Sequence, residues 1–301
     1  MSAPTLDIHF GDNLTVIGRF PDQSFDLIYI DPPFNTGRVQ ARTQLKTVRD
    51  ENGDREGFKG KRYRSVRLGT KAYDDIFDDY LEFLEPRLIE AKRLLASNGS
   101  FFLHLDYREV HYAKILLDQV FGRESFINEI IWAYDYGARS KKRWSAKHDN
   151  ILWYANDPAN YTYRYDDIDR IPYMAPGLVT KEKAARGKTP TDTWWHTIVS
   201  PNGKEKTGYP TQKPLGVINR LIKVHSNPGD RVLDFFAGSG TIGESAIRNG
   251  RSAVLVDSNE EAIEVMVRRL GFASPRLHDC DHQAMSREET LYDMVADAPG
   301  G

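Results

Sequence analysis

Cysteine is nearly absent from this chain of 301 residues, which carries a single one, Cys280. One thiol cannot form a disulfide within the chain, and disulfide frameworks belong to oxidising compartments, so the sequence favours a reducing cytosol. Long apolar runs are also missing. Nothing approaches the roughly 18 consecutive apolar residues of a membrane helix, and the N-terminus lacks a basic segment followed by an apolar core. We therefore expect a cytoplasmic protein that is neither secreted nor embedded in a membrane.

An overall excess of positive charge is missing too, since the formal net charge is −2 at pH 7. Contacts with nucleic acid must then come from local basic patches. The run His-Asp-Cys-Asp-His at 278–282 stands alone, and without a second cluster it predicts a solvated tail rather than a metal site. The length allows one large α/β domain with an insertion, or two domains.

The most distinctive element present is an apolar stretch that ends in a carboxylate, two prolines and a ring. Phe25–Ile30 predicts a buried strand, and Asp31, Pro32, Pro33 and Phe34 follow it. The prolines restrict the backbone and remove donors, which leaves the Asp31 carboxylate and bare carbonyls as acceptors. These groups suit a flat ligand with an amino group, while Phe34 stacks on its face. An ordinary proline turn explains the same residues equally well.

A second apolar strand ends at Asp234 and runs into a turn that contains Gly238 and Gly240. A predicted helix over 241–249 and a strand over 252–256 follow, and Asp257 lies nineteen positions after Gly238. An acidic residue at a spacing of ~20 reaches the ribose hydroxyls in nucleotide-binding sheets. The turn lacks the full G-x-G-x-x-G pattern, so the sequence favours a nucleoside without a pyrophosphate over a nicotinamide cofactor.

The opening of the chain predicts a parallel α/β sheet. A strand at Leu6–Phe10, a short helix and the strand before Asp31 follow one another, and ligands of such sheets bind beyond the carboxyl ends of the strands. Asp12 lies there, although a helix cap is its favoured role. His104 and Asp106 end a further strand and can also reach a ligand, but a cap is again favoured for Asp106.

Two segments carry local positive charge. Residues 36–72 hold eleven Lys and Arg against four acidic residues and show no sustained apolar period, which predicts a polar loop. It is either a solvated charge run or a segment that contacts phosphates and orders on binding. Between 135 and 205 periodicity fades, and cations interleave with aromatic residues, which indicates either a nucleic-acid surface or a small satellite core. The residues concerned are Arg139, Lys141, Lys142, Arg143 and Lys147 around Trp144, then Trp194, Trp195 and His196.

Four blocks of sequence together carry a family resemblance. They are Gly-Asp-Asn at 11–13, Asp-Pro-Pro-Phe-Asn-Thr-Gly at 31–37, Gly-Tyr-Pro-Thr-Gln-Lys-Pro at 208–214 and Asp-Phe-Phe-Ala-Gly-Ser-Gly-Thr at 234–241. In this order the chain resembles the S-adenosylmethionine-dependent DNA amino-methyltransferases of the β arrangement. That family includes methylase subunits of type III restriction-modification systems and solitary adenine methylases.

The resemblance implies a Rossmann-like methyltransferase fold. Its sheet is mostly parallel with helices on both faces, the motif order is circularly permuted, and a target-recognition region is inserted. The implied catalytic domain covers 1–134 and 206–272, the recognition region 135–205, and a C-terminal tail 273–301. The implied cofactor is S-adenosylmethionine and the implied partner is double-stranded DNA. A homodimer and a cognate restriction endonuclease are further expectations.

The resemblance assigns a base-binding set and a cofactor-binding set, residue by residue. The cations Arg139, Lys141, Lys142, Arg143 and Lys147 are expected to contact DNA because they interleave with an aromatic residue. In the resemblance, Asp31, Pro32, Pro33 and Phe34 hold the flipped target base. Asp257 binds the cofactor ribose, Asp12 lies near its adenine, and Lys213 with Thr211 lies near its methionine carboxylate. The cofactor set in full is Asp12, Thr211, Lys213, Asp234, Phe236, Ala237, Gly238, Gly240, Thr241 and Asp257.

The chemistry implied is direct transfer of a methyl group to an exocyclic amine. Asp31, where cytosine enzymes of this type commonly have Ser, favours adenine N6, and cytosine N4 is the alternative. Methylation at cytosine C5 needs a thiolate nucleophile. The only cysteine, Cys280, is remote in sequence from both motifs, so this reaction is excluded. Two further functions fit the same residues: a non-catalytic partner subunit that binds the cofactor or DNA, and a methyltransferase for RNA or protein amides.

Overall fold

The computed structural model describes residues 3–35, 38–49, 55–56, 62–75, 79–200 and 202–279. The chain divides into two compact units, one formed by residues 1–32 with 81–301 and the other by residues 33–80. No helix among the described residues is both long enough and apolar enough to cross a membrane.

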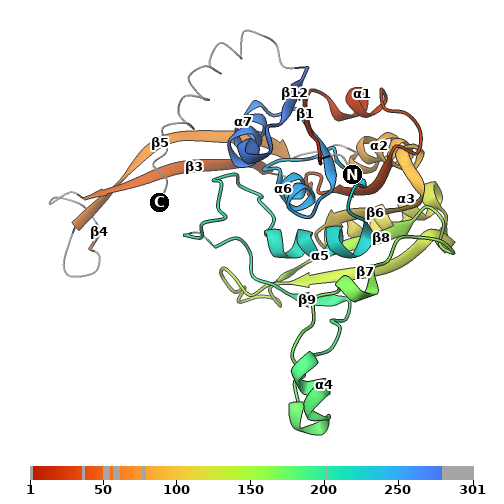
Figure 1. The fold of residues 1–301 in the computed structure, drawn as a ribbon. Coiled ribbons are helices and arrows are strands. Elements are labelled where there is room, and N and C mark those ends of the chain that lie inside the picture. Colours follow the sequence, from red (N-terminus) through yellow and green to blue (C-terminus); the bar gives the residue numbers. More distant parts are fainter. Residues whose placement is uncertain are drawn as a thin grey trace. The chain divides into compact units, whose positions relative to one another are not determined.

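The larger unit is built on a nine-stranded sheet with the order β12-β1-β11-β10-β2-β6-β8-β7-β9 (Figure 1). Neighbours in this order are often far apart in sequence, as a doubly wound α/β sheet requires. The strands are β1 (Leu6–Phe10), β2 (Phe25–Ile30), β6 (Leu95–Leu105), β7 (Phe126–Ala133), β8 (His148–Ala155), β9 (Thr193–Trp195), β10 (Arg231–Asp234), β11 (Ser252–Asp257) and β12 (Arg276–His278).

The central strands run parallel. β1 pairs with β11, β11 with β10, β10 with β2 and β2 with β6, all in parallel register. β8 is antiparallel to both β6 and β7, while β9 is parallel to β7. The carboxyl ends of β1, β11, β10, β2 and β6 therefore meet at one edge, where ligands of open α/β sheets bind.

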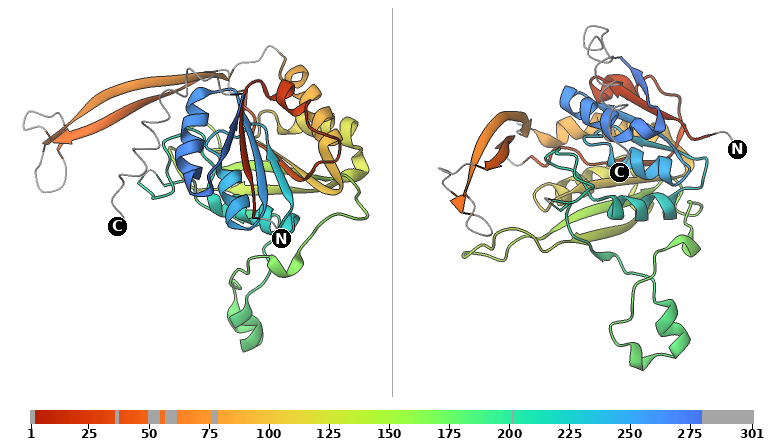
Figure 2. Two further views of the ribbon diagram at one scale, coloured as in Figure 1. Left: turned by 45° about the horizontal axis from the view of Figure 1, so that its top comes forward. Right: turned by 60° about the vertical axis from the view of Figure 1, so that its left-hand side comes forward.

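Helices cover both faces of the sheet. Figure 2 shows α5, α6 and α7 on one face and α1, α2 and α3 on the other. The predicted α/β fold, a mostly parallel sheet with helices on both faces, is thereby confirmed. The helices are α1 (Asn13–Ile17), α2 (Tyr80–Leu94), α3 (Val110–Phe121), α4 (Lys181–Arg186), α5 (Leu215–His225), α6 (Thr241–Arg248) and α7 (Glu260–Leu270), with 3-10 turns at Arg123–Ser125, Tyr165–Asp167, Pro176–Leu178 and Gly271–Ala273.

The core is continuous across the sheet because its central strands are apolar on both faces. On the face of α5 to α7, Leu27, Val232 and Leu255 pack in one cluster with Ile218 and Met266. Burying such side chains contributes about 1.5–3 kcal/mol each. The core thus anchors the strands whose ends carry the predicted site residues.

The first residues of the predicted tail, 273–301, belong to the fold. Arg276–His278 form β12, which extends the sheet beside β1 in parallel register. Asp7 on β1 accepts hydrogen bonds from Arg276 Nη2 at 2.6 Å and from His278 Nε2 at 2.8 Å. A strand of three residues is too short to show a periodicity, so sequence patterning missed it. Residues 280–301, including Cys280, lie outside the described residues.

The prediction of a polar loop over 36–72 is wrong for the residues described in the second unit. β3 (Arg38–Arg49) and β5 (Arg62–Asp75) form an antiparallel pair, and β4 (Arg55–Glu56) adds to β5. The two strands of such a pair are joined by backbone hydrogen bonds, which form wherever the charged side chains lie. A search for one apolar face therefore did not detect the β3–β5 pair. β-branched residues in the sequence of β3, such as Val39, Thr43 and Thr47, were the available signal.

The predicted recognition region, 135–205, contains two strands of the sheet, β8 and β9. Outside these strands lie the β7–β8 loop at 135–147, residues 156–192, which carry α4 away from the sheet (Figure 1), and residues 196–200 and 202–205. Trp194 belongs to the main core rather than to a small satellite core, whereas Trp144 and Trp195 are 98% and 74% exposed.

Candidate active site

Four predicted site carboxylates lie at the carboxyl ends of four adjacent parallel strands. Asp31 directly follows β2, Asp234 ends β10 and Asp257 ends β11. Asp12 comes two residues after β1, at the start of α1. Because the strand order is β1-β11-β10-β2, the topology brings together residues that are up to 245 positions apart in sequence.

Asp31 forms an ion pair with Lys213. Lys213 Nζ donates to Asp31 Oδ2, and the two side chains are only 11% and 14% exposed for Lys213 and Asp31 respectively. The other oxygen, Asp31 Oδ1, is buried and has no hydrogen-bond partner among the described residues. Pro32, which follows, is buried, whereas Pro33 and Phe34 begin the second unit. An acceptor oxygen in this state can receive an N–H from a ligand.

The glycine turn is fastened to the end of β11. Gly238 N donates to Asp257 Oδ2 at 2.8 Å, and Ala237 N donates to the carbonyl of Val256 at 3.1 Å. Gly238 has a φ of +50°, and a Cβ there would lie 3.0 Å from Tyr209 Cε1. Glycine is therefore required on two grounds, the left-handed backbone and the close approach of the 208–214 segment.

Asp234 holds the start of this turn by a hydrogen bond to its backbone. It is 3% exposed, and its Oδ1 accepts from Phe236 N at 2.9 Å. Burial raises the pKa of Asp234 well above its usual value, and the charges of Asp31 and Asp257 add to the effect. Burial also raises the pKa of Asp257, although backbone N–H groups donate to that carboxylate. Asp234 contacts the backbone of the turn, so positioning is its observed role.

Asp12 is the cap of α1. Its Oδ1 accepts from both the backbone N and Oγ1 of Thr15 at 2.9 Å, which confirms the predicted helix cap. Arg87 reaches it from α2, with Nη2 3.4 Å from Asp12 Oδ2. Asn13 links the same corner to the glycine turn, since its Nδ2 donates to the carbonyl of Phe235 at 2.9 Å.

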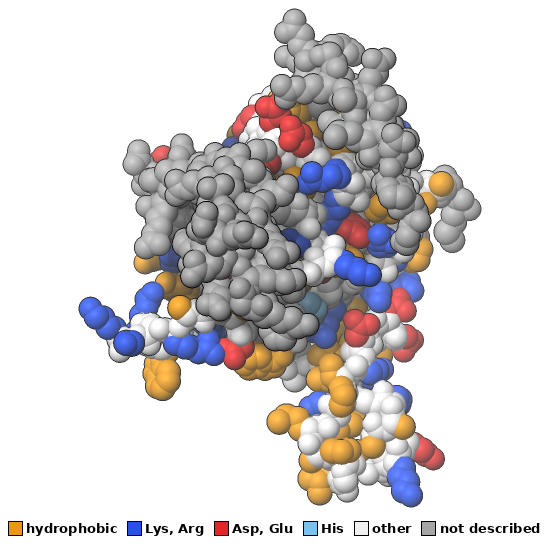
Figure 3. Space-filling view, turned by 90° about the vertical axis from the view of Figure 1, so that its left-hand side faces the viewer, with side chains coloured by type: hydrophobic (Ala, Val, Ile, Leu, Met, Phe, Trp, Pro, Cys, Tyr) orange, Lys and Arg blue, Asp and Glu red, His pale blue; other side chains and the backbone are white. Residues whose placement is uncertain are grey.

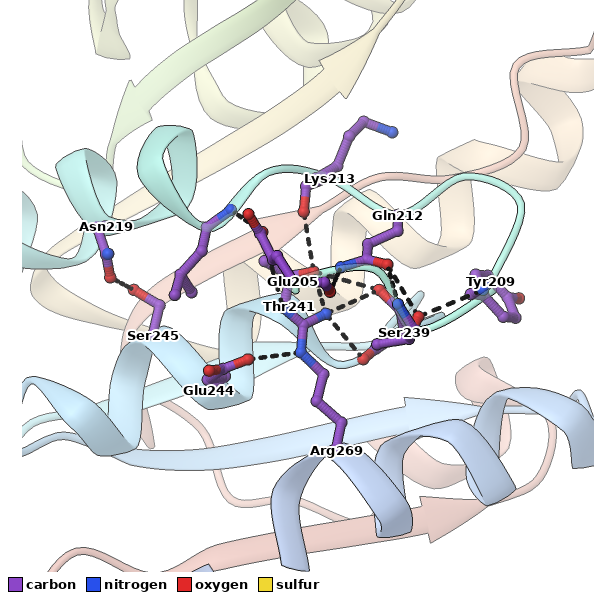
Figure 4. A network of polar contacts seen from close by, with 12 residues as sticks. Glu205, Tyr209, Gln212, Lys213, Asn219, Ser239, Thr241, Glu244, Ser245 and Arg269 are labelled. Carbon is purple, nitrogen blue, oxygen red and sulfur yellow. Dashed lines mark hydrogen bonds and ion pairs between the residues drawn. The ribbon is translucent and has the colours of Figure 1, made fainter. Parts of the chain in front are cut away.

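Arg269 on α7 anchors the other side of the turn and was missed by sequence reasoning (Figure 4). Its side chain is 5% exposed, and its Nε donates to Glu244 Oε2 at 2.6 Å. Its Nη1 donates to Thr241 Oγ1 at 2.8 Å and to the carbonyl of Ser239 at 3.2 Å. In the sequence Arg269 resembles a cation in the last turn of a helix, and only its tertiary contacts distinguish it.

The 205–213 segment is folded onto this network by its own polar side chains. Gln212 Nε2 donates to the carbonyl of Glu205 at 2.6 Å, and its Oε1 accepts from Thr207 N at 2.8 Å. Thr241 Oγ1 donates to the carbonyl of Lys213 at 3.2 Å, and in Figure 4 the Lys213 side chain points away from the network. Thr211 is exposed. The backbone of Lys213 is thus held while its side chain extends to Asp31.

A buried polar chain lies beside Asp31. Tyr29 Oη is 2.7 Å from His104 Nδ1, and His104 Nε2 is 3.4 Å from Asp149 Oδ2. Tyr134 Oη donates to Asp149 Oδ1 at 3.0 Å. Burial raises the pKa of Asp149, but hydrogen bonding and charge from His104, together with the charge of Lys213, outweigh it and lower the pKa overall. Sequence reasoning singled out His104 but not Asp149, which follows no motif.

A pocket of about 310 Å³ opens next to this chain. It is lined by Asp106 and Tyr107 after β6, by Tyr134 and by Arg143 and Lys147 of the β7–β8 loop. Two of the five predicted DNA contacts therefore reach it, whereas Arg139, Lys141 and Lys142 are exposed elsewhere on the loop. On the face drawn in Figure 3, Lys and Arg side chains are spread over several places, with Asp and Glu between them.

Comparison with known proteins decides the family. The model of the DNA methylase family N6_N4 matches residues 25–268. The chain belongs to this DNA methylase family. It is 31% identical to the type II methyltransferase M.HpaI of Haemophilus parainfluenzae, over 85% of this methylase and 71% of the relative. It is 30% identical to the DNA adenine methyltransferase YhdJ of Escherichia coli K12, over 88% of this methylase and 82% of the relative.

The fold of the methylase recurs in a solved structure of low sequence identity. The modification methylase TTHA0409 of Thermus thermophilus, complexed with S-adenosylmethionine, superposes with a TM-score of 0.57 at 20% identity, over 91% of this chain and 98% of the other. Family membership confirms the prediction of a DNA methyltransferase whose cofactor is S-adenosylmethionine.

Proposed function

We propose that this methylase transfers a methyl group from S-adenosylmethionine to the N6 amino group of adenine in double-stranded DNA. The main support for this proposal is Asp31, whose carboxylate lies at the end of a central strand. Its Oδ1 is buried and has no hydrogen-bond partner among the described residues. An exocyclic amine is the kind of donor that this oxygen lacks. An Asp at this place, rather than the Ser common in cytosine enzymes of the family, supports adenine, as does the similarity to YhdJ.

Asp31 and the carbonyl of Pro32 accept the two amine hydrogens in this proposal. The amine is a poor nucleophile because its lone pair is delocalised into the ring. Two acceptors at fixed positions pyramidalise the nitrogen and aim the lone pair, and such positioning supplies about 7–11 kcal/mol of a barrier. Phe34 stacks on the flipped base, and Pro33 restricts the backbone between Pro32 and Phe34.

The residues at the carboxyl edge fit the methyl donor, which supplies a methyl group on a positively charged sulfur. The backbone at Gly238 is packed so closely against Tyr209 that a side chain there has no room. The Asp257 carboxylate follows Gly238 at the spacing of a ribose acceptor. Lys213 provides a cation for the donor's carboxylate, with Thr211 beside it. Asp12, Phe236, Ala237 and Gly240 complete the donor site, which Asp234 and Thr241 position.

Labelled S-adenosylmethionine and unmethylated genomic DNA test the proposal directly. We expect label in DNA and N6-methyladenine in the nucleoside digest. N4-methylcytosine without N6-methyladenine would transfer the function to the cytosine alternative. Label that enters RNA or protein but never DNA would contradict the proposal altogether.

We further propose that the β7–β8 loop at 135–147 and residues 156–192 form the target-recognition region. The loop carries Arg139, Lys141, Lys142 and Arg143, all exposed, around the exposed Trp144, so cations for phosphate adjoin a ring for stacking. The family resemblance also predicts a homodimer and a cognate endonuclease. Sedimentation of the purified methylase tests the first of these expectations.

Replacing Lys141, Lys142 and Arg143 by Gln should weaken DNA binding and reduce its salt dependence. Each lost phosphate contact makes the negative slope of log K against log salt shallower by about 0.9. The slope of the triple variant should therefore be shallower than that of the parent by up to about 3. Binding to a duplex across a series of salt concentrations measures the slope. Arg123→Gln, an exposed cation at the opposite end of β7, is the control. A triple variant with the slope of the parent would remove the loop from the interface.

A further inference from the structure

Lys213 forms an ion pair with Asp31, the carboxylate that the proposed reaction needs. Its Nζ donates to Asp31 Oδ2, and both side chains are largely withdrawn from solvent. A pair so placed is screened less than an exposed one and holds its partner more firmly. With Lys213 in this position, one of the two Asp31 oxygens is taken before any base arrives.

The pair also cancels the charge of Asp31. When an amine attacks a sulfonium methyl, positive charge develops on the amine nitrogen, and a nearby carboxylate stabilises that charge. A carboxylate already neutralised by a lysine does so less well. The ion pair therefore has to open before Asp31 can act fully on the amine.

The side chain of Lys213 can move without its backbone. The Lys213 carbonyl accepts from Oγ1 of Thr241, the first residue of α6 after the glycine turn, and the next residue but one, Leu215, begins α5. Beyond this fixed point a four-carbon stem carries a compact ammonium with three donors. Its charge acts beyond its ion-pair partner, since it favours the ionised forms of Asp149 and Asp234. Lys213 thus adjoins both the turn of the donor site and the acceptor of the base site.

We propose that Lys213 gates Asp31 and so couples the two sites, an inference that rests on the proposed function. With the donor site empty, Lys213 holds Asp31 Oδ2. When the donor's carboxylate enters, Lys213 moves to it, and both Asp31 oxygens and the full negative charge become available to the amine. Cofactor binding then precedes productive base binding, because the ligand's carboxylate releases the acceptor.

Binding of two related ligands tests the gate without any DNA. S-adenosylhomocysteine carries the carboxylate, whereas 5′-methylthioadenosine has the same nucleoside and a thioether but no carboxylate. Breaking the pair with Asp31→Asn should raise affinity for S-adenosylhomocysteine about tenfold, within the usual range of coupling between sites, and leave 5′-methylthioadenosine unchanged. Lys213→Gln should lower affinity for S-adenosylhomocysteine alone. Calorimetric titration measures the affinities of the parent and of both variants for each ligand.

The double variant separates gating from simple repulsion between Asp31 and the ligand. If Lys213 carries the effect, Asp31→Asn has no further influence on S-adenosylhomocysteine in the Lys213→Gln background. A gain that persists there, or no gain in the single variant, overturns the gate. Asp118→Asn is the control, since it breaks another Lys–Asp pair, with Lys114, on the remote helix α3.

Methyl transfer by the parent protein distinguishes this inference from the proposed function. If the parent methylates adenine but the two ligands respond alike to every variant, only the gate is wrong. If the parent binds neither ligand and transfers no label to DNA, the proposed donor site is wrong and the gate with it.

Discussion

Asp31→Ala is expected to lower the rate of methyl transfer roughly 10³-fold, about 4 kcal/mol in the barrier, which is the scale seen when one preorganised electrostatic contact is removed. The substitution removes the acceptor of the amine hydrogen and the charge that faces the developing ammonium. Single-turnover transfer of labelled methyl to DNA measures the loss.

Two controls make this result specific. S-adenosylhomocysteine should still bind to Asp31→Ala, which shows that the fold and the donor site are intact. Asp118→Asn, remote from the carboxyl edge, should transfer at the rate of the parent. Turnover by Asp31→Ala within tenfold of the parent would remove Asp31 from the central role.

Arg269→Ala should have the largest effect on stability among the variants considered. Removal of one partner from a buried ion pair typically costs about 3–5 kcal/mol. Arg269 is 5% exposed and joins Glu244, Thr241 and Ser239, so its loss leaves polar groups without partners beneath the glycine turn. The lower end of that range is expected, because Arg248 also pairs with Glu244. Urea denaturation measures the change in the free energy of unfolding.

Its neighbour offers a matched control on the same helix. Arg268 makes one described hydrogen bond, from Nη2 to the carbonyl of Thr207 at 3.2 Å, and it is exposed. Arg268→Ala should therefore change the free energy of unfolding by less than about 1 kcal/mol. Equal losses for the two variants would show that the Arg269 network does not hold the turn.

Much of the candidate site could be predicted from sequence because its parts are local. Asp31, Asp234 and Asp257 each end an apolar strand, and the glycine turn is bounded by a strand and a helix, so patterning alone places them at one edge. The parallel α/β fold followed from the same alternation of strands and helices. The family resemblance then supplied their roles.

The contacts that organise the site could not be predicted, because they join distant parts of the chain. Lys213 meets Asp31 across 182 positions, and Asp149 meets His104 across 45. Arg269 had no local signal that separated it from Arg268. The β3–β5 pair escaped for a different reason, since a charged hairpin is held by backbone hydrogen bonds and has no single apolar stripe to find.

The nine-stranded sheet ends on both sides in strands of three residues, β12 and β9. A long border strand displays a row of unpaired backbone donors and acceptors that can template the addition of another chain. β12 and β9 each offer so few of these groups that a second sheet gains little by docking on them. β9 covers only residues 131–133 of β7, so on that side the border continues along residues 126–130 of β7, which is the stretch of this edge where an added strand would find most backbone groups to pair with.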